Sequence, residues 1–406
     1  MTTVREAPEG TPDAAVLRAA MVRELRDEYN AITSDAVAAA VATVPRHLFA
    51  VGEPLKAAYA ANNALVIKRD TRGAALSSLS ATHIQAVMLE QAGIDPGMRV
   101  LEVGSGGYNA ALIQELVGAS GTVVSVDIDR DIAERARTCL VNAGYGRVEV
   151  VLADAEHGVP GHAPYDRIIV TAGACDIPPA WVDQLRESGR IVVPLRLRGL
   201  TRSIAFDHDG RDLVSRSYQL SGFVPMQGAG SGEEQLVSVG DGATLRIEDQ
   251  PRQHFDVDAL RNALGSPRLE RWSGTTFDLP DEQELFLMTS APNAVVLQVK
   301  QELVDQGRFA PSAARGVPAL VSGGTLAYRT KRPNPQTGGY ESGVFAHGPE
   351  AEVIAEHYVE LLRRWARDHF RRGAARIRYL SEAPNAPVPS PGLIAKRHGT
   401  VEVSWP

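Results

Sequence analysis

The stretch Met98–Asp129, MRVLEVGSGGYNAALIQELVGASGTVVSVDID, decides the fold of this chain. Its apolar run Val100–Val103 predicts a short buried strand, which breaks into the glycine-rich turn Gly104–Gly107. Apolar residues then recur at helical spacing up to Val117, and Val123–Asp127 predicts a second buried strand that ends in an acid. Strand, glycine turn, helix, strand and terminal carboxylate form half of a Rossmann unit, which binds an adenosine-bearing cofactor.

The two ends of this unit carry its chemistry. Glycines allow a tight backbone turn and let a ligand approach where a β-carbon would clash. Asp127 follows Gly104 by 23 residues, at the carboxyl end of a strand, where it can accept hydrogen bonds from both hydroxyls of a ribose. The alternative for this pattern is an ordinary core turn of an α/β protein that binds no ligand.

The residues after the glycine turn distinguish two cofactors. A dinucleotide site requires a third glycine in the first turn of the helix, where it allows close packing beside the pyrophosphate. Tyr108, Asn109 and Ala110 occupy that place here. S-adenosylmethionine has no phosphates to hold, so its loop is free to differ, and the sequence favours this methyl donor over a dinucleotide.

The composition is that of an ordinary globular protein of 406 residues. A net charge of −7 argues against a nucleic-acid partner, which needs a basic face. Cys139 and Cys175 lie far apart, which excludes a disulfide scaffold and a cysteine zinc site, and no His/Asp/Glu cluster has the spacing of a metal site. With no apolar run of about 18 residues and no signal-peptide pattern, we expect a cytoplasmic protein without a membrane partner. The oligomeric state is left open.

Strands and helices alternate beyond the first unit. The pattern predicts a helix over residues 132–140 and strands over residues 148–152, 165–171 and 190–194. Such alternation is typical of a parallel sheet covered by helices on both faces. Apolar segments around the turn signal Asp209–Gly210 then predict an antiparallel pair. A doubly wound parallel sheet finished by an antiparallel edge hairpin is the α/β outline of class I S-adenosylmethionine-dependent methyltransferases.

Composition and pattern divide the chain into four segments. They are a flexible tail (1–15), the Rossmann-like catalytic domain (16–228), a glycine-rich linker (229–234) and a C-terminal α+β domain (235–406). Near the start of the chain, Thr11 is expected to cap a helix with Pro12 at its first position, and Ser34 to cap the next helix. In the C-terminal domain, a long helix starting at Pro349 is expected to bury Val353, Ile354, His357, Tyr358, Leu361, Leu362 and Trp365.

Five short motifs occur in an order typical of one enzyme family. They are Val44–Phe49 (VPRHLF), Ser78–Ala81 (SLSA), Leu101–Gly106 (LEVGSG), Asp166–Ala172 (DRIIVTA) and Phe223–Met226 (FVPM). On these motifs, residues 16–228 resemble the protein-L-isoaspartate O-methyltransferase family. The resemblance implies a sheet with the strand order 3-2-1-4-5-7-6, S-adenosylmethionine as cofactor, S-adenosylhomocysteine as product, and methyl transfer to a peptide carboxylate.

Ser80 is the expected catalytic residue, because its hydroxyl can donate a hydrogen bond that orients one oxygen of the acceptor carboxylate. A cap on the following helix would also explain this serine. Asp154 and the backbone amide beside it are expected to read adenine, unless Asp154 forms only an Asx turn. Glu102 is expected to hold the glycine loop or to reach the methionine amino group through water, and Tyr108 to pack on the methionine part or on the sheet. The complete set of expected cofactor contacts is Ser78, Glu102, Gly104, Ser105, Gly106, Tyr108, Asp127, Ile128, Asp154, Ala155 and Thr171.

The chain departs from the family's motifs at positions that surround the substrate there. Thr82 replaces a proline, Lys68 and Ala155 replace glycines, Asn62 replaces an aspartate, and the glycine loop is one residue shorter. Together with the C-terminal domain, these departures resemble the long "FxLD system" homologues of lanthipeptide pathways. Relatives in that group methylate either an Asp side chain, which can close to an aspartimide, or a C-terminal carboxylate. The expected partner is then a modified precursor peptide of a ribosomal peptide pathway.

Two other interpretations stay open. A general isoaspartyl repair enzyme with an added domain predicts activity on short isoaspartyl peptides of any sequence. A Rossmann nucleotide-binding protein that is no methyltransferase predicts NAD binding, or no binding of S-adenosylmethionine. The chain lacks a Tyr-x-x-x-Lys pattern for hydride transfer, which weighs against the second interpretation.

Overall fold

The computed structural model describes residues 13–232, 234–240, 242–248, 255–278, 280–382 and 390–406. Within these residues the chain forms two compact units. The first contains residues 13–195, 202–208 and 216–231, and the second contains residues 196–201, 209–215 and the described part of 232–406. Most of the predicted tail, including Thr11 and Pro12, lies outside the described residues.

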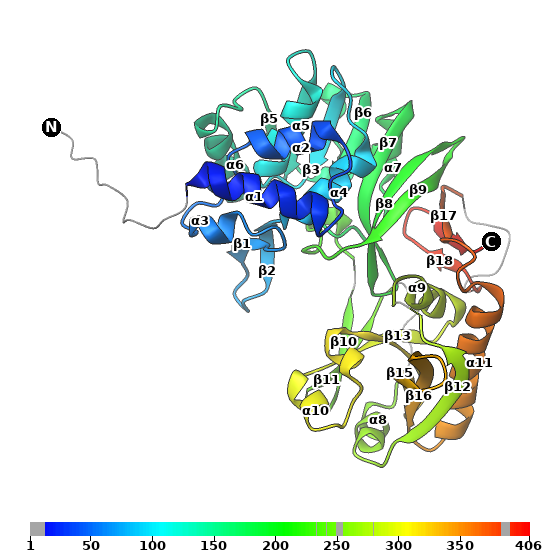
Figure 1. The fold of residues 1–406 in the computed structure, drawn as a ribbon. Helices are drawn as coiled ribbons and strands as arrows, with labels where there is room; N and C mark the ends of the chain where they lie inside the picture. The colour runs from blue at the N-terminus through cyan, green and yellow to red at the C-terminus, as the bar shows by residue number, and fades with distance from the viewer. Residues whose placement is uncertain (1–12, 233, 241, 249–254, 279, 383–389) are drawn as a thin grey trace. The chain divides into compact units, whose positions relative to one another are not determined.

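The first unit is built on a twisted α/β sheet (Figure 1), in which the strands lie in the order β5-β4-β3-β6-β7-β8-β9. The bounds of these strands are β3 Arg99–Val103, β4 Thr122–Asp127, β5 Glu149–Leu152, β6 Tyr165–Val170, β7 Leu185–Leu197, β8 Leu200–Asp209 and β9 Asp212–Leu220. The pairs β3–β4, β4–β5, β3–β6 and β6–β7 are parallel. The predicted parallel sheet with its edge hairpin is confirmed.

The last strands correct the order implied by the family resemblance. β7 returns into β8 through the two-residue turn Arg198–Gly199, in which both residues have positive φ (52° and 87°). β8 returns into β9 through Gly210, with a φ of 70°. Short turns of this kind place consecutive strands side by side as hairpins. The strands of the first unit therefore run 3-2-1-4-5-6-7 in chain numbers, and the implied order 3-2-1-4-5-7-6 is wrong.

Helices flank this sheet in the first unit (Figure 1). Their bounds are α1 Ala14–Asp27, α2 Asp35–Thr43, η1 Arg46–Leu48, α3 Leu55–Ala58, α4 Thr82–Ala92, α5 Tyr108–Val117, α6 Arg130–Asn142, η2 Ala155–His157, η3 Pro160–His162, α7 Pro179–Asp183 and η4 Gly228–Gly230. Apolar side chains from α2, α4, α5 and the strands pack into one core cluster. The same unit holds a separate two-stranded sheet of β1 Leu65–Arg69 and β2 Ala75–Leu79.

The first two helices test the capping predictions. α1 is capped by Asp13, whose side chain accepts a hydrogen bond from the amide of Ala15. The cap is therefore Asp13 and not Thr11, which, like Pro12, lies outside the described residues. Ser34 caps α2, as predicted.

The prediction that Ser80 caps the helix α4 is wrong. The N-cap of α4 is Ala81, which makes no side-chain capping bond, so Ser80 precedes the cap by one residue. The helix ends as predicted at Gly93, which has a left-handed φ of 57°. A purely structural capping role therefore no longer accounts for the serine at position 80.

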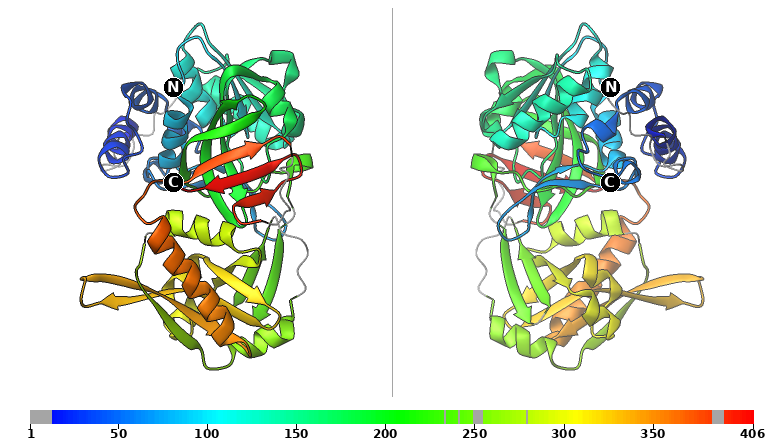
Figure 2. Two further views of the ribbon diagram at one scale, coloured as in Figure 1. Left: turned by 90° about the vertical axis from the view of Figure 1, so that its right-hand side faces the viewer. Right: turned by 90° about the vertical axis from the view of Figure 1, so that its left-hand side faces the viewer.

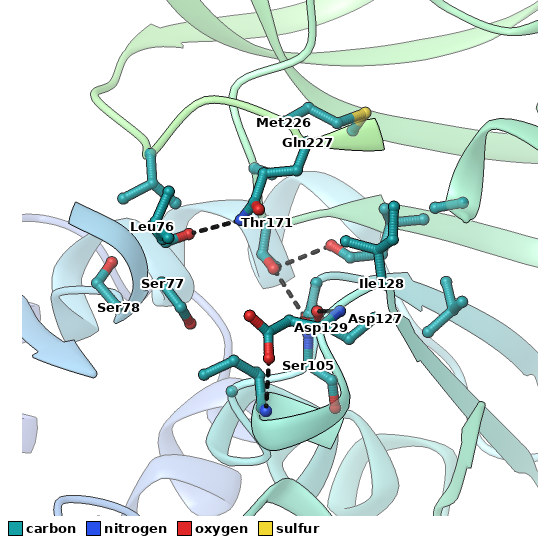
Figure 3. Close-up of a pocket in the computed structure, with 18 of the residues that line it drawn as sticks. Leu76, Ser77, Ser78, Ser105, Asp127, Ile128, Asp129, Thr171, Met226 and Gln227 are labelled. Atoms are coloured by element: carbon teal, nitrogen blue, oxygen red, sulfur yellow. Dashed lines mark hydrogen bonds between the residues drawn. The ribbon is translucent and has the colours of Figure 1, made fainter. Parts of the chain in front are cut away.

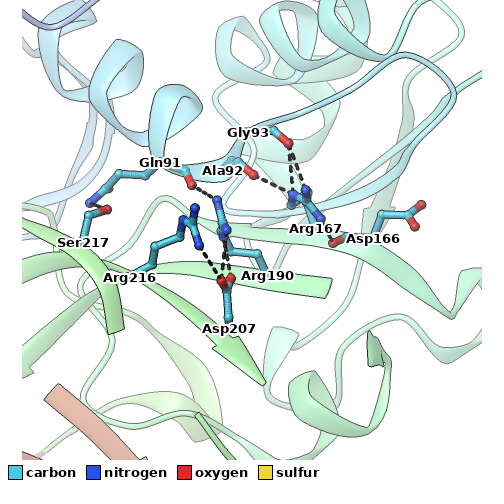
Figure 4. A network of polar contacts seen from close by, with 9 residues as sticks. All are labelled: Gln91, Ala92, Gly93, Asp166, Arg167, Arg190, Asp207, Arg216 and Ser217. Carbon is cyan, nitrogen blue, oxygen red and sulfur yellow. Dashed lines mark hydrogen bonds and ion pairs between the residues drawn. The ribbon is translucent and has the colours of Figure 1, made fainter. Parts of the chain in front are cut away.

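The carboxyl end of α4 is held by two arginines from the sheet (Figure 4). Arg167 donates to the Gly93 carbonyl (3.0 Å), and Arg190 donates to the Gln91 carbonyl (2.9 Å). Arg190 also pairs with Asp207 through two bonds of 2.6 and 3.0 Å. Cationic donors satisfy the last carbonyls of a helix and favour its negative end. They fix α4, and with it the residues just before its first turn, against β6, β7 and β8.

The second unit contains a seven-stranded sheet in the order β10-β11-β13-β14-β15-β16-β12. The elements of this unit are β10 Gln235–Gly240, β11 Ala243–Ile247, α8 Val257–Leu264, β12 Leu269–Thr276, α9 Pro280–Ser290, β13 Ala294–Val299, α10 Gln301–Asp305, η5 Pro311–Arg315, β14 Val317–Ser322, β15 Thr325–Asn334, β16 Gly339–His347, α11 Ala351–Asp368, β17 Arg376–Leu380, β18 Leu393–Ala395 and β19 Thr400–Ser404. Every pairing in the seven-stranded sheet is antiparallel, including β10–β11, β13–β14 and β15–β16. The α+β character predicted for the second half is confirmed.

The long helix α11 (orange) crosses one face of this sheet (Figure 2). Its buried side consists of Ile354, Ala355, Tyr358, Val359, Leu361, Leu362 and Trp365. Val353, predicted to be buried, is 71% exposed, and His357 is exposed too. Ala355 and Val359 face the sheet in their place. Val353 and His357 lie on the outer side of the helix, which also carries Glu352, Glu356 and Glu360.

Candidate active site

A pocket lies at the carboxyl ends of β3, β4 and β6 in the first unit (Figure 3) and encloses about 650 Å³ of free space, part of it open to solvent. It is lined by Leu76, Ser77, Ser78, Val103, Gly104, Ser105, Gly106, Val126, Asp127, Ile128, Asp129, Ile132, Ala155, Thr171, Ala172, Val224, Pro225, Met226 and Gln227. Its position matches the rule that open α/β sheets bind ligands beyond the carboxyl ends of their strands.

Two glycines of the loop after β3 are required by their surroundings. Gly104 has a φ of +98°, and a β-carbon there would lie 2.5 Å from the Thr171 hydroxyl oxygen. That hydroxyl donates to the carbonyl of Gly104 (3.0 Å). Gly107, also left-handed, would place a β-carbon 3.1 Å from the Phe49 ring. The loop therefore passes too close to the end of β6 and to the Phe49 ring for larger residues at these two positions. Its other side lines the pocket, where a ligand can approach the backbone.

Asp127 ends β4 at the pocket, with both carboxylate oxygens held by backbone amides. Oδ2 accepts from Ser105 N (2.8 Å) and Oδ1 accepts from Asp129 N (2.9 Å). Burial raises the pKa of Asp127, and these two amide bonds oppose the shift. Because each carboxylate oxygen has room for a second donor, both oxygens can still receive a ribose hydroxyl.

Ser105 adds a second polar group to this side of the pocket. Its side chain is 1% exposed, and its hydroxyl has no hydrogen-bond partner within the described part of the chain. A buried hydroxyl without a partner is costly. Ser105 lines the pocket, and the open acceptor positions on Asp127 fit a ligand that brings its own polar groups.

Two of the predicted contacts, Glu102 and Tyr108, lie behind the pocket and are not among its lining residues. Glu102 is fully buried and accepts from Asn109 Nδ2 (2.9 Å) and Ser125 Oγ (2.5 Å). Burial, only partly opposed by these bonds, raises the pKa of Glu102 to about 7. The Tyr108 ring is also fully buried, with the Arg46 guanidinium 4.7 Å from its centroid. Glu102 therefore joins α5 to β4, and the roles expected for Glu102 and Tyr108 toward the cofactor stay predictions.

The strand end that precedes η2 forms an Asx turn. Asp154 Oδ1 accepts from Glu156 N (3.0 Å), and Oδ2 accepts from Ala229 N (2.8 Å). Ala155 lines the pocket and Asp154 does not. A β-carbon on Gly228 would lie 2.5 Å from Asp154 Oδ2, so this glycine packs against the carboxylate. The glycine-rich stretch that the sequence predicts as a linker thus begins within the short helix η4. The role of Asp154 as adenine reader stays a prediction.

The opposite wall of the pocket comes from β2. Ser77 and Ser78 line the pocket, whereas Ser80 does not. The Ser80 carbonyl accepts from Nη2 of Arg46 (2.8 Å), whose guanidinium is fully buried and also donates to the Gln85 side chain (3.0 Å). Sequence reasoning missed this arginine, although its place in the Pro-Arg-His turn was a usable signal. It fixes the backbone at the expected catalytic serine.

A strap over the pocket, Val224–Gln227, was also missed as a ligand-facing segment. Gly173 makes two backbone hydrogen bonds with this strap. Its amide donates to the Val224 carbonyl (2.8 Å), and its carbonyl accepts from the Met226 amide (3.1 Å). Gln227 Nε2 donates to the Leu76 carbonyl (3.2 Å), which ties the strap to β2 (Figure 3). The signal was present in the sequence as the Phe-Val-Pro-Met motif, but no local pattern indicates that it covers a pocket.

The family model for Protein-L-isoaspartate(D-aspartate) O-methyltransferase (PCMT) matches residues 17–231. The chain belongs to this family. It is 38% identical over 212 residues to Protein-L-isoaspartate O-methyltransferase 2 of Archaeoglobus fulgidus, covering 52% of this chain and 93% of the relative. It is 40% identical over 217 residues to the Protein-L-isoaspartate O-methyltransferase of Hyperthermus butylicus, covering 51% of this chain and 86% of the relative. Neither name refers to a ribosomal peptide.

A solved structure named Protein-L-isoaspartate O-methyltransferase covers 96% of this chain and 99% of its own, with a TM-score of 0.51 and 22% sequence identity. At this identity the likeness concerns the fold alone. The likeness extends beyond residues 17–231, so the solved structure shares the fold of the second unit as well.

As a member of the isoaspartate methyltransferase family, the chain is an S-adenosylmethionine-dependent carboxyl O-methyltransferase with the class I fold. This membership favours the methyl donor over the dinucleotide. Among the described residues, no group of three or more His, Cys, Asp or Glu side chains is arranged to hold a metal ion. In the same residues, no helix is both long and apolar enough to cross a membrane.

Proposed function

We propose that the chain methylates the carboxylate of L-isoaspartyl residues in peptides, the general repair activity of its family. The observation that carries the proposal is the pocket of residues 103–106 and 126–129, in which the Asp127 carboxylate keeps acceptor positions open toward a ligand, in a chain of this family. Of the interpretations weighed from the sequence, the names of the relatives favour this one.

Asp127 and Ser105 would hold the cofactor, S-adenosylmethionine, through the ribose hydroxyls and one further polar group. When bound, the cofactor supplies an electrophilic methyl group, whose C–S bond breaks as a carboxylate oxygen of the acceptor forms the new C–O bond. The buried side chains of Val126 and Ile132 give this side of the pocket an apolar lining, which limits the water beside the reacting groups.

The acceptor carboxylate explains why the pocket needs no general base. A carboxyl group titrates near pH 4, so the attacking oxygen is already ionised at neutral pH and loses no proton on methylation. The only titratable side chains among the lining residues are Asp127 and Asp129, which are held by backbone amides and by Lys68. The chain therefore contributes orientation and water exclusion rather than proton transfer.

Ser80 remains the proposed catalytic residue, through a hydrogen bond to the acceptor carboxylate. Two observations support this: Ser80 is not the cap of α4, and its carbonyl is held by the buried Arg46. Ser78, which lines the pocket, is the nearest alternative donor in the same segment.

Matched peptides test this function on the full-length protein. Incubation with S-adenosylmethionine should add one methyl group to a short isoaspartyl peptide, seen by mass spectrometry, and none to the same peptide with a normal aspartyl link. Calorimetry with S-adenosylhomocysteine provides the independent binding readout. A protein that binds the product but leaves the isoaspartyl peptide unmodified contradicts the proposed acceptor while retaining the cofactor site.

A second candidate is a dedicated peptide substrate, a modified precursor from a ribosomal peptide pathway. It is favoured by Lys68, Thr82 and Asn62 at motif positions where the family has other residues, and by the second unit as a peptide-holding part. The solved structure that covers 96% of the chain weakens the second argument, because it shares the extended fold. A small precursor peptide encoded beside the gene, methylated with a much higher kcat/KM than unrelated isoaspartyl peptides, would decide for this candidate.

A further inference from the structure

The β1–β2 hairpin forms one wall of the pocket with very little sheet support. Leu76, Ser77 and Ser78 of β2 line the pocket, yet β1 and β2 pair only with each other. A two-stranded sheet is marginally stable by itself and depends on outside contacts. Leu65 and Leu79 anchor the base of the hairpin in the core, and Gln227 binds the Leu76 carbonyl.

A lysine at an irregular point of the hairpin supplies a further contact. The pairing of β1 with β2 shifts register on both sides of Lys68. Such bulges redirect a side chain from the regular alternation of a strand. Lys68 Nζ reaches the first turn of α6, where it contacts Asp129 Oδ2 (2.6 Å) and Asp131 Oδ2 (2.8 Å). The Lys68 and Asp129 side chains are 33% and 16% exposed, so this pair is partly shielded from solvent, whereas Asp131 is 76% exposed.

Asp129 connects Lys68 to Asp127, at the end of the pocket where the ribose is expected. Its other oxygen, Oδ1, accepts from Asp131 N (3.0 Å) and caps α6. Its own backbone N–H donates to Asp127 Oδ1 (2.9 Å). Asp129 itself lines the pocket and its side chain is only 16% exposed. A continuous chain of polar contacts thus joins Lys68 to the carboxylate expected to bind ribose.

We propose that Lys68 is a positioning residue for the cofactor: it fixes the β2 wall to the first turn of α6 and holds Asp129, and through it Asp127, in the ligand-ready arrangement. The inference rests on the methyl-donor site proposed above. Lys68 also pairs with Asp129, the carboxylate that repels Asp127, and so reduces that repulsion.

The test compares Lys68→Met with Arg130→Met in the full-length protein. Arg130 lies on the same turn of α6, is exposed, and pairs only loosely with Glu134 at 3.8 Å, so it is a matched control. Ion pairs at partly exposed sites have modest effects, so Lys68→Met should raise the Kd for S-adenosylhomocysteine and the KM for S-adenosylmethionine about three- to tenfold, with kcat changed less than about twofold. Lys68→Arg should restore both constants to within about twofold of the wild type.

Two further readouts separate positioning from a general structural role. Raising KCl from about 0.05 to about 0.5 M should weaken product binding by the wild type more than by Lys68→Met, because salt screens the ion pairs. Asp131→Asn should raise the Kd for S-adenosylhomocysteine about twofold. Adding it to Lys68→Met should not raise this Kd further, because the two changes remove the same contact.

The outcomes are distinct. Wild-type protein that ignores S-adenosylhomocysteine overturns the methyl-donor site itself. If the wild type binds and Lys68→Met matches Arg130→Met within about twofold, the site stands and the role of Lys68 is overturned. The role is equally overturned if only kcat falls, or if the KM for the peptide rises while that for the cofactor stays constant.

Discussion

The two walls of the pocket are built in different ways. The wall at the ends of β3, β4 and β6 rests on buried parallel strands, and Val100, Leu101 and Val124 behind it are completely inaccessible to solvent. The wall from β2 belongs to a two-stranded sheet whose side chains are mostly half-exposed. The first wall is fixed by the core of the fold, whereas the second depends on a few polar contacts.

The largest effect is expected from Gly104→Ala in the first wall. The new β-carbon would overlap the Thr171 hydroxyl in a left-handed backbone position, so the loop must shift. We expect product binding to weaken by more than about 100-fold and stability to fall by about 1–3 kcal/mol, measured by calorimetry and thermal unfolding.

Gly161→Ala is the matched control for this change. Gly161 has open space around its β-carbon position and no positive φ. Alanine there should leave binding intact and change stability by less than about 1 kcal/mol. Normal cofactor affinity in Gly104→Ala would show that the first wall is less rigid than the comparison implies.

The second-largest effect is expected from Asp127→Asn. An amide keeps the shape of the side chain but places an NH₂ group near amides that now donate to the carboxylate, and it removes a charged acceptor for ribose. Hydrogen bonds to charged groups contribute about 1.5–3 kcal/mol, so the Kd for S-adenosylhomocysteine should rise roughly 10- to 100-fold. Glu134→Gln, an exposed change on α6, controls for the loss of one negative charge. Equal affinities of the two variants would remove Asp127 from the site.

The same division explains what the sequence could and could not predict. Gly104, Ser105 and Asp127 are recognisable because strand, turn and acid lie close together in the chain, and the strand register then brings them to one edge of the sheet. The second wall is assembled by distant contacts, such as Arg46 with the Ser80 carbonyl and Gln227 with the Leu76 carbonyl. No local periodicity encodes such pairs, so the strap and the buried arginine were missed.

Side-chain direction was the other source of error. Glu102 and Tyr108 flank the glycine loop in sequence, yet both point into the core behind it. Alternation along β3 separates Glu102 from the pocket-lining Val103, and this depends on which face of the sheet the helices cover. The order of the last strands, corrected above, likewise depends on the turn at Arg198–Gly199 rather than on the apolar pattern.

A smaller effect is expected from Ser80→Ala, which probes the second wall. The serine does not cap α4, so its hydroxyl is not needed to start the helix, and the melting temperature should change little. Loss of a hydrogen bond to the acceptor carboxylate should lower kcat/KM for the peptide about tenfold, with the Kd for S-adenosylhomocysteine unchanged. Ser78→Ala is the companion variant, because Ser78 lines the pocket. An unchanged rate in Ser80→Ala, with a loss in Ser78→Ala, would move the catalytic role to Ser78.

The smallest change in cofactor binding is expected from Glu102→Gln, behind the first wall. Burial raises the pKa of Glu102 to about 7 from 4.5, so the folded protein holds a proton that the unfolded chain releases between these values. The contribution of this group to stability is therefore complete below about pH 4.5 and is lost as the pH rises through about 7. Glutamine mimics the protonated acid, with Oε1 still accepting from Asn109 and the amide donating to Ser125 Oγ.

Denaturant unfolding of the wild type and Glu102→Gln at about pH 5 and about pH 8 measures this effect. The two proteins should be similar at the lower pH, and the variant should be more stable at the higher pH by an amount on the order of 3 kcal/mol. The exposed change Glu187→Gln should show no such trend. Cofactor affinity should stay within about twofold, because Glu102 does not line the pocket. A stability difference that is independent of pH would mean that Glu102 stays ionised in the folded state, and that the first wall is held by a buried charge instead of a neutral hydrogen-bonded acid.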